Sequence, residues 1–561
     1  MKRIILPLLL LFCLQIVAQV APNKYVAYFK DKDNNPYTLA DPSQFLSVKS
    51  LQRRANQSIG IEFSDLPVTP SYIEGVKSIG VQVINTSKWL NSVTFYAETD
   101  SLATIVSTLP FIKSMAKLPN PKAESKTTAN TMQWNDGNIL PFEGFGSQYA
   151  PKNTLKSSHQ THYNYGGGYN QVHMLNGDAL HNLGYNGKGM VIAVLDAGFW
   201  HVDQLDAFDS LWDNNQILGT RDFVEPGSNV FRDDIHMHGM MVLSTMGANK
   251  PNDLVGTAPG ASYWLIRTED GPSENIIEEY NWVSGAEFAD SVGADIINSS
   301  LGYTEYDNPA KSHVYADMDG NTAPATIGAD LAARKGILVV NSAGNSAQNT
   351  WHYIGAPADG DSVFTIGAVD AFGAYASFSS TCPTAEGRMK QNVVTHGHGS
   401  AITVPDRNTT YGNGTSFSSP IMAGMVACLW QAHPALKNME IIQSIEKAGN
   451  QFNTPDSLLG YGIPDIMAAH GYLSSINPIP NASVSIYPNP FQTYLRINHS
   501  FEPGSKISVT ISNLQGDQVY IDEVNWEPVL VLNSFQDLAQ GIYVLRLTAG
   551  DKQSTHKVVK L

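Results

Sequence analysis

Residues 191–196 read VIAVLD, a short and continuous apolar run that ends in an acid. Runs of this kind are typical of a strand that is buried on both faces of a parallel sheet. Sites in such sheets form at the carboxyl ends of the strands, which is where Asp196 stands. We therefore expect an α/β domain with Asp196 at its site. The alternative is that Asp196 is only an acidic cap after a strand.

A second informative segment is Gly414-Thr415-Ser416-Phe417-Ser418-Ser419-Pro420. The apolar stretch IMAGMVACLW follows directly and predicts a helix, with Pro420 in the first turn, where a missing N–H costs nothing. Ser416 would then lie in the positive field of the helix N-terminus, beside backbone N–H groups that can stabilise an oxyanion. The alternative is an ordinary helix N-cap.

Two more polar residues stand at comparable places between these segments. His238 opens an apolar helical stretch, MMVLSTMGA, and can point into a cleft. A metal-binding pair with His236 is the weaker interpretation, because no third or fourth ligand follows at a recognisable spacing. Asn345 ends GILVVNSAGN, a buried strand that runs into a Gly-Asn loop. Its amide can donate to an oxyanion, or the residue can simply occupy a turn.

These four residues supply the parts of a nucleophilic site. A serine hydroxyl near neutral pH needs an adjacent base, and that base needs a carboxylate to orient it. Ser416, His238 and Asp196 fill these three roles, and Asn345 with the Ser416 backbone N–H would hold the oxyanion. The order acid, histidine, serine differs from the order in α/β-hydrolases and from that in chymotrypsin-like chains.

The order and the motifs resemble those of the subtilases, the subtilisin-like serine peptidases. The resemblance spans about residues 170–475 and rests on VIAVLDAGF, HGMMV, INSSLGY, NSAGNS and GTSFSSPIMAG. It implies a doubly wound, mostly parallel sheet and a secreted serine endopeptidase that works through an acyl-enzyme. It also implies that Ser300, Leu301 and Gly302 bind substrate backbone as an added β-strand. Met240 and Ala197 depart from the family pattern but remove no reacting group.

Other segments complete the expected catalytic domain, at residues 161–475. Its core strands should be VIAVLD, SYWLIRT, DIINSSL, GILVVNS and SVFTIGAV. Residues 274–292 have the spacing of an amphipathic helix, and Glu278 and Glu279 are expected on its solvated face. The floor of the specificity pocket is expected near Trp351–Gly355.

Three smaller features of this domain bear on metals. VVTHGHGS, at residues 393–400, is expected to be a loop in which His396 and His398 are exposed rather than ligands. The chemistry requires no cofactor, but the resemblance allows a structural calcium ion. Asp317-Met318-Asp319-Gly320-Asn321 places carboxylates around a glycine turn that would suit one. The EF-hand register is absent, and a solvated turn is the simpler interpretation.

The chain has 561 residues, 42% hydrophobic and 15% charged, so it can bury large cores. A formal net charge of −16 argues against nucleic acid as a partner. Residues 1–19 place two cations before a short apolar stretch and predict a secretory signal peptide. If this peptide is removed, Cys382 and Cys428 remain. Cys428 is expected to be a buried small residue, and a disulfide between the two stays open.

Residues 20–118 are expected to form an α+β domain, because strand-like and helical segments alternate there. The strand-like segments are KYVAYF, VQVINTS, SVTFYAE and FIKSMAKL, and the helical ones are PSYIEGVKSIG and DSLATIVSTLP. A polar stretch follows, and residues 119–160 are expected to be an exposed linker where the chain is processed. The resemblance implies that the domain is a propeptide, which assists folding and then inhibits the active cleft as an intramolecular partner. The alternative is an accessory domain that stays attached.

Residues 476–561 change in character to short alternating strands, which predict a β-sandwich. The expected strands are SVSIYPNP, YLRINHS, KISVTISNLQG, QVYIDEV, GIYVLRLTAG and STHKVVKL. SIYPNPF, NLQG, GIYVLRL and the terminal KVVKL resemble the C-terminal sorting domain of proteins exported by type IX secretion in Bacteroidetes. The resemblance implies the type IX machinery as a partner. It also implies a secreted or cell-surface protein that crosses the periplasm and outer membrane. The alternative is a carbohydrate- or surface-binding sandwich.

Two other function classes stay open besides a peptidase of protein or peptide substrates. The chain could be a catalytically silent surface-binding protein on a subtilase scaffold, although every reacting residue is present. It could also be an esterase or lipase, which shares the triad chemistry but has a different residue order and serine motif.

Overall fold

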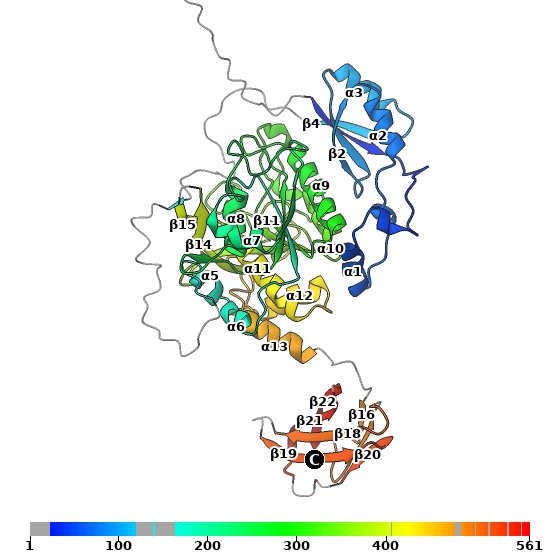
Figure 1. The fold of residues 1–561 in the computed structure, drawn as a ribbon, viewed down its shortest axis with the longest axis vertical. Coiled ribbons are helices and arrows are strands. Elements are labelled where there is room, and N and C mark those ends of the chain that lie inside the picture. Colours follow the sequence, from blue (N-terminus) through cyan, green and yellow to red (C-terminus); the bar gives the residue numbers. More distant parts are fainter. Residues whose placement is uncertain are drawn as a thin grey trace, which may run out of the picture. The chain divides into compact units, whose positions relative to one another are not determined.

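The computed structural model describes residues 23–118, 139–140, 163–405, 407–476, 484–499, 501–513, 517–533, 535, 538–550 and 552–561. The predicted signal peptide and nearly all of the predicted linker lie outside these residues. The chain divides into two compact units, Met1–His470 and Gly471–Leu561 (Figure 1). Among the described helices, none is long and apolar enough to cross a membrane.

A nine-stranded sheet forms the centre of the first unit. Its strands lie in the order β5 (Ile139–Leu140), β15 (Arg407–Asn413), β14 (Val393–Val404), β13 (Phe364–Asp370), β12 (Leu338–Ser342), β11 (Ile296–Ser299), β6 (Val191–Asp196), β10 (Ser262–Arg267) and β7 (Ile217–Asp222). All neighbours from β7 to β14 are parallel, and β15 and β5 add an antiparallel edge. The mostly parallel sheet confirms the predicted α/β class.

The central strands form where the sequence has continuous apolar runs. Every residue of β6, β11 and β12 is buried. The five predicted core strands correspond to β6, β10, β11, β12 and β13. Because β6 and β11 are parallel and Ser299 pairs with Leu195, the carboxyl ends of both strands meet at one edge of the sheet.

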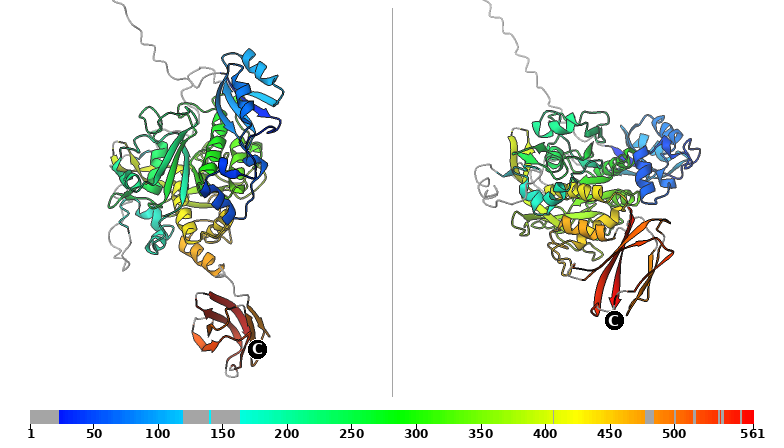
Figure 2. Two further views of the ribbon diagram at one scale, coloured as in Figure 1. Left: turned by 45° about the vertical axis from the view of Figure 1, so that its right-hand side comes forward. Right: turned by 60° about the horizontal axis from the view of Figure 1, so that its bottom comes forward.

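Helices cover both faces of this sheet (Figure 2). α8 (His238–Gly247) and α11 (Thr415–Ala432) pack together on one face, and α9 (Ile277–Val292) and α10 (Pro324–Arg334) on the other. The smaller elements are α5 (Tyr169–His173), α6 (Gly177–Asn182), α7 (Asp209–Asp213), β8 (Asn249–Lys250), β9 (Leu254–Val255), α12 (Asn438–Lys447) and α13 (Ile466–Ile476). α11 is buried from Thr415 to Trp430, so it forms part of the core.

An antiparallel sheet in the order β2-β3-β1-β4 forms the N-terminal domain. Its elements are β1 (Lys24–Phe29), α1 (Val48–Asn56), α2 (Pro70–Lys77), β2 (Gln82–Ser87), β3 (Ser92–Tyr96), α3 (Asp100–Ser107) and β4 (Ile112–Leu118). The sequence predicted all of these except α1. The buried side chains of α1 are Ser50, Arg53 and Arg54, so this helix has no buried apolar face that a pattern could indicate.

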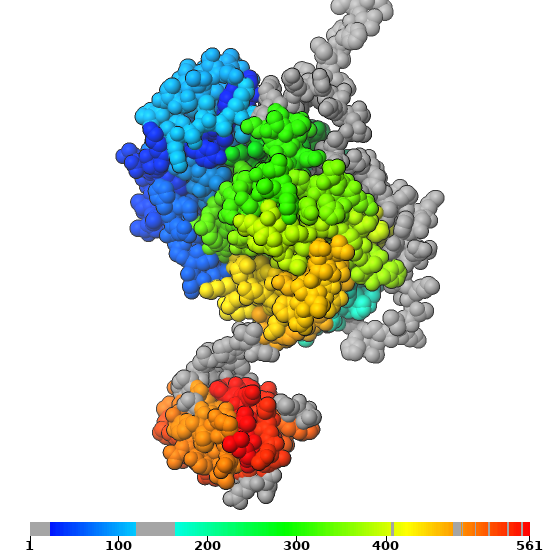
Figure 3. All heavy atoms as spheres, turned by 180° about the vertical axis from the view of Figure 1, so that it is seen from behind, coloured from blue at the N-terminus to red at the C-terminus, as the bar shows by residue number. Residues whose placement is uncertain are grey.

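The N-terminal domain packs directly against α9, and Figure 3 shows its blue surface in contact with the green surface of the catalytic region. The contact buries a carboxylate of that helix. Glu287 accepts hydrogen bonds from Ser87 Oγ at 2.5 Å and from the backbone N–H groups of Lys88 and Trp89 at 2.8 and 2.9 Å.

The predicted solvated face of α9 is wrong, because Glu278 and Glu279 are both buried. Glu278 accepts hydrogen bonds from the backbone N–H groups of Asp270 and Asn275. Glu279 lies 2.7 Å from His313 Nε2. Neighbouring loops therefore supply the partners that let these carboxylates leave water.

The predicted loop VVTHGHGS is also wrong, because these residues begin β14. His396 is buried and His398 is only partly exposed. Burial lowers the pKa of His396 to about 4, which keeps its ring neutral near pH 7. Strands β13 and β15 flank this segment on both sides, so it is part of the sheet rather than of the surface.

Two antiparallel sheets form the second unit. One has the order β16 (Val484–Tyr487), β17 (Leu495–His499) and β20 (Val529–Leu532), and the other β19 (Gln518–Asn525), β18 (Lys506–Ser512), β21 (Gly541–Ala549) and β22 (Lys552–Lys560). Side chains of both sheets share one apolar core, which includes Ile497 and Leu545. The predicted β-sandwich is confirmed, with β20 as a strand that the sequence did not indicate.

Candidate active site

Asp196 and His238 meet at the carboxyl end of the central strand. Asp196 ends β6 and is fully buried, and His238 is the first residue of α8. His238 Nδ1 lies 2.9 Å from Asp196 Oδ1 and 3.0 Å from Oδ2. The backbone N–H of Ala197 also donates to Oδ1, at 2.7 Å. This hydrogen bond comes from the backbone of Ala197, so the departure of the Ala197 side chain from the family pattern does not affect it.

A glycine permits this close approach. A Cβ on Gly239 would lie 2.5 Å from the Gly198 carbonyl oxygen and 2.9 Å from Asp196 Cβ. A side chain at this position would push the start of α8 away from the end of β6. The glycine after His238 is thus a packing requirement of the Asp196–His238 pair.

Ser416 lies in the first turn of α11, which begins at Thr415. Pro420 is therefore in the second turn, and its predicted place in the first turn is wrong. A helix bonds the N–H of residue 420 to the carbonyl of residue 416, and proline has no N–H to give. Ser300 Oγ donates to the Ser416 carbonyl instead, at 2.9 Å. The predicted substrate strand is thereby linked to the serine.

His238 and the serine turn lie next to each other. The ring centroids of His238 and Phe417, the residue after Ser416, are 6.2 Å apart. Ser416 is almost fully buried at 5% exposure. The acid, the imidazole and the serine thus come from β6, α8 and α11 to one edge of the sheet.

The Asn345 amide is oriented by the residue before the serine. Asn345 Oδ1 accepts hydrogen bonds from Thr415 N and Thr415 Oγ1, both at 2.9 Å. Its Nδ2 donor therefore faces away from Thr415. A Cβ on Gly414 would lie 3.6 Å from both Asn345 Nδ2 and Ser416 N, so these two donors border the same space. An oxyanion needs such a pair of N–H donors.

The segment Ser300-Leu301-Gly302 continues directly from β11. Ser300 and Leu301 are buried, and Asn341 Nδ2 donates to the Leu301 carbonyl at 3.0 Å. Gly302 is partly exposed and borders a cavity that Asn345 also borders. All of the predicted site residues therefore lie around the carboxyl ends of β6, β11 and β12.

Comparisons with known proteins agree with the fold. Residues 187–462 match the model of the subtilase family, residues 24–133 the peptidase S8 propeptide domain of Bacteroidota, and residues 485–561 a secretion system C-terminal sorting domain. Subtilisin E from Bacillus subtilis (strain 168) is 30% identical over 307 residues, which are 53% of this chain and 70% of that protein. This chain belongs to the subtilase family.

Other relatives extend the comparison. Subtilisin from Bacillus pumilus is 29% identical to this subtilase over 303 residues, which are 53% of this chain and 97% of that one. The crystal structure of fervidolysin from Fervidobacterium pennivorans, a keratinolytic enzyme related to subtilisin, aligns with a TM-score of 0.52. The alignment covers 97% of this chain and 78% of fervidolysin at 16% identity, so it shows a shared fold.

The matches assign the class of this subtilase. It is a serine-type endopeptidase, a hydrolase with a propeptide domain and a type IX sorting domain. It is a secreted or cell-surface protein of the Bacteroidota.

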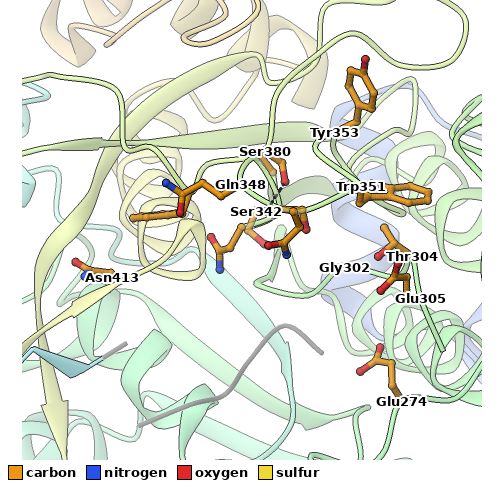
Figure 4. A pocket seen from close by; sticks show the side chains of 17 residues that line it. Glu274, Gly302, Thr304, Glu305, Ser342, Gln348, Trp351, Tyr353, Ser380 and Asn413 are labelled. Atoms are coloured by element: carbon orange, nitrogen blue, oxygen red, sulfur yellow. Dashed lines mark hydrogen bonds between the residues drawn. The ribbon is translucent and has the colours of Figure 1, made fainter. Parts of the chain in front are cut away.

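A cavity of about 380 Å³ opens beside Asn345 in this subtilase (Figure 4). Trp351, Tyr353 and Gly355, from the segment expected to form the pocket floor, line this cavity. Glu274 and Glu305 line it as well, and sequence reasoning missed both. The only available signal for Glu305 was an acid two residues beyond the INSSLGY motif.

Buried carboxyl groups lie behind the predicted substrate strand. Glu269 accepts hydrogen bonds from Tyr303 Oη at 2.6 Å and from Thr268 Oγ1 at 2.8 Å. Burial raises the pKa of Glu269 to about 7. Burial also raises the pKa of Glu278 well above its ordinary value, and the nearby Glu274 and Glu269 add to this shift.

The predicted calcium turn uses its carboxylates internally. Asp317 Oδ2 accepts a hydrogen bond from Val314 N at 2.9 Å. Asp319 accepts three, from Asn321 N at 2.7 Å and from the N and Oγ1 of Thr322 at 2.9 Å. In the part of the chain that the structure describes, no three His, Cys, Asp or Glu side chains gather as metal ligands would. The residues of this turn therefore do not fit a calcium ion.

The two cysteines of the catalytic region are free thiols, and both are buried. Cys428 Sγ donates to the Thr257 carbonyl at 3.2 Å within the core. Burial raises the pKa of Cys428, so it stays protonated and acts as a small buried residue.

Proposed function

We propose that Asp196, His238 and Ser416 form the catalytic triad with which this endopeptidase hydrolyses peptide bonds. The observation that carries the proposal is the pair of contacts from His238 Nδ1 to the Asp196 carboxylate, 2.9 and 3.0 Å, beside the serine turn. A proton held on Nδ1 by a buried carboxylate leaves Nε2 as the base for the Ser416 hydroxyl. The carboxylate also stabilises the imidazolium that forms.

The proposed reaction has two matching halves. His238 takes the proton of Ser416 Oγ while that oxygen bonds to the peptide carbonyl carbon, and the carbonyl oxygen becomes an oxyanion. The carbon–nitrogen bond then breaks, and His238 gives its proton to the leaving amine. In the acyl-enzyme that remains, a water molecule repeats the sequence with His238 as base. The acid is released and the serine hydroxyl is restored.

In this mechanism Asn345 Nδ2 and the Ser416 backbone N–H hold the oxyanion. Their position on either side of the space at Gly414 supports this role. Loss of one such donor typically costs about 3–4 kcal/mol of transition-state stabilisation. Ser300, Leu301 and Gly302 would bind the substrate backbone as an added strand, with protein or peptide substrates as the partners.

A fluorophosphonate probe tests the proposal directly. Its phosphorus accepts the serine oxygen as the peptide carbon would, so we expect a covalent adduct on Ser416, located by mass spectrometry of peptides from the labelled chain. Heat-denatured protein is the control and should carry no adduct. An adduct on another serine would refute the proposed triad. An unlabelled folded chain from which residues 20–118 have been removed would favour the catalytically silent scaffold.

We also propose that residues 20–118 inhibit the cleft until the linker at residues 119–160 is cut. Val26 of β1 and Leu118, the last residue of β4, join an apolar cluster with Ile277 and Tyr280 of α9. The chain thus enters the linker from a point that is packed against the catalytic region. The sorting domain, placed at residues 476–561, would recruit the type IX machinery for export. A structural calcium ion at another place remains a prediction of the resemblance.

Substitution of Asp290 by asparagine should release the N-terminal domain sooner. Arg53, Arg54 and Lys88 of that domain lie 2.6, 2.8 and 3.0 Å from the fully buried Asp290 carboxylate. Burial alone would raise the pKa of Asp290, but Lys88, Arg53 and Arg54 lower it to about 2. Loss of the charge leaves the buried Arg53 and Lys88 without their ion-pair partner, whereas Arg54 keeps Asp65 at 2.9 Å. Breaking buried pairs in this way costs roughly 3–5 kcal/mol of docking. We expect a shorter lag before activity appears in the full chain.

The exposed Asp213, changed to asparagine, is the matched control and should keep the original lag. Probe labelling after full processing shows whether each variant has folded. Because the pKa of Asp290 falls from 3.8 to about 2, its contribution is complete above pH of about 4 and is lost only as the pH falls towards 2. An Asp290→Asn lag equal to that of the parent at pH 7 would rule out this anchor.

A further inference from the structure

The charged side chains that line the cavity beside Asn345 are all acidic. Of its 17 lining residues, Glu274 and Glu305 are acidic and none is Lys, Arg or His. Figure 4 shows both carboxylates at the end of the cavity near Gly302 and far from Asn413. Neither glutamate forms an ion pair with any residue that the structure describes. Both are partly exposed, and both line the cavity.

A second hollow on the same strand has the same character. It shares Glu274 and Gly302 with the larger cavity and adds Glu269, Asp270 and Glu278. This smaller hollow also has no lining Lys or Arg. The predicted substrate strand therefore runs between two acid-lined spaces.

The acids that line the two hollows form an acidic wall, which consists of Glu269, Asp270, Glu274, Glu278 and Glu305. Their carboxyl groups repel one another. Burial raises the pKa of Glu274 well above its ordinary value, and Glu269, Asp307 and Glu279 raise it further. A carboxylate in such a setting gains more from a nearby cation than one in water does, because the cation offsets both the burial and the repulsion. Asp270 has such a partner, because Arg267 Nη2 lies 3.4 Å from its Oδ1. Glu274 and Glu305 have no ion-pair partner among the described residues, so a cation beside these two carboxylates would be stabilised.

A cation already faces this wall in the precursor. Burial lowers the pKa of Lys24 at the start of β1, while the carboxylates of Asp270 and Glu278 act in the opposite direction. The N-terminal domain therefore places an ammonium group within the electrostatic field of two acids that line the smaller hollow, Asp270 and Glu278.

We propose that this acidic wall makes the endopeptidase select a lysine or arginine side chain on the acyl side of the scissile bond. The inference rests on the proposed function, because Asn345 and the Ser416 N–H must hold the carbonyl of the bond that is cut. A residue placed there, with its backbone along Ser300–Gly302, directs side chains into the cavity between Asn345 and Glu274. The aliphatic stem of Lys or Arg can lie along Trp351 while its charge reaches Glu274 and Glu305.

Matched peptides measure this selectivity. The full chain, in the state that reacts with the fluorophosphonate probe, is assayed on peptides that differ at one acyl-side position. That position holds lysine, arginine, norleucine or glutamate and is moved stepwise away from the scissile bond. At one or more positions we expect kcat/KM for lysine or arginine to exceed that for norleucine by about 10- to 100-fold, the range of a hydrogen bond to a charged group. Glutamate should be the poorest.

The double variant E274Q/E305Q should bring the lysine-to-norleucine ratio close to one, whereas Asp213→Asn should keep the parent ratio. Titration with the probe gives the concentration of active sites, so a poorly folded variant does not distort the ratio. A parent enzyme that cleaves norleucine and lysine peptides equally well would overturn the proposal, as would a preference that survives in E274Q/E305Q.

The test separates the two proposals. If Ser416 reacts with the probe and peptides are cleaved without a basic preference, the triad stands and the acidic pocket fails. If no adduct forms on Ser416 and no peptide is cleaved, the proposed function itself fails.

Discussion

Replacement of Ser416 by alanine is expected to lower kcat by about 10⁶-fold, the size of loss seen when the serine of subtilisin is removed. Without its hydroxyl the site has no nucleophile, although Asn345 and the backbone N–H at residue 416 can still bind a carbonyl oxygen. The residual rate should remain above that in water for this reason. Hydrolysis of a fluorogenic peptide by purified, processed chain measures the effect.

Ser418, two residues further along α11, offers a matched control. Its hydroxyl donates to the Thr415 carbonyl at 3.0 Å and is buried within the helix. Ser418→Ala should retain kcat within about tenfold, because no reacting group is lost. Equal melting temperatures of Ser416→Ala and the parent would show that the fold is intact. A folded Ser416→Ala protein that turned over peptides at the parent rate would refute the mechanism.

Replacement of Asp196 by asparagine should reduce kcat by about 10⁴-fold. The Asp196 carboxylate accepts the Nδ1 proton of His238 and is fully buried, so its charge acts at close range. An amide there can hold the imidazole in the wrong tautomer, with its proton on Nε2, and it cannot stabilise the imidazolium. Because this interaction is made in the transition state, kcat and kcat/KM should fall together while KM changes little.

The exposed Asp203 lies in the loop after β6 and serves as the control for Asp196. Asp203→Asn removes the same charge a few residues away and should leave kcat unchanged. Steady-state kinetics of the two variants, with probe titration of active sites, provide the comparison. A fall of less than tenfold in Asp196→Asn would mean that another group orients His238.

The candidate catalytic residues could be predicted because each stands at a boundary that apolar patterning marks. Asp196 ends a continuous buried strand, His238 and Ser416 open helices, and Asn345 follows another strand. In a parallel sheet such boundaries meet at one edge, so the chain order alone indicated that they would converge. The roles of Ser300, Leu301 and Gly302 came only from the family resemblance.

Buried charges could not be predicted, because their partners are remote in the sequence. Glu287 accepts a hydrogen bond from Ser87, a separation of 200 residues. Arg53 reaches Asp290 across 237 residues. Helical periodicity depends only on local spacing. It therefore predicted a solvated face for the acids of α9 and did not indicate α1. The acidic side of the cavity was missed for the same reason, because Glu274 and Glu305 come together only in the fold.

His396 and Pro420 show a second limit. A sequence with two histidines and two glycines between residues 393 and 400 resembles a loop, yet strands on both sides hold it in the sheet. For Pro420 the prediction was wrong by one turn. In the first turn the missing N–H would cost no hydrogen bond, whereas in the second turn the helix loses the bond to the Ser416 carbonyl. The compensating hydroxyl of Ser300 lies 116 residues from Ser416 and could be found only in the structure.

The cationic contacts of the N-terminal domain affect its release from the catalytic region and its rebinding in different ways. Lys49, Arg53, Arg54 and Lys88 face Asp290 and Asp295 while the domain is docked. Once it diffuses away, these carboxylates are hydrated and the helix surface becomes anionic. A return would require water to be stripped from all of these ions at once, and salt in the medium would screen the attraction between the separated parts. If the domain inhibits the enzyme as proposed, the same ion pairs that hold it in place would slow its rebinding after release and make that rebinding depend on salt.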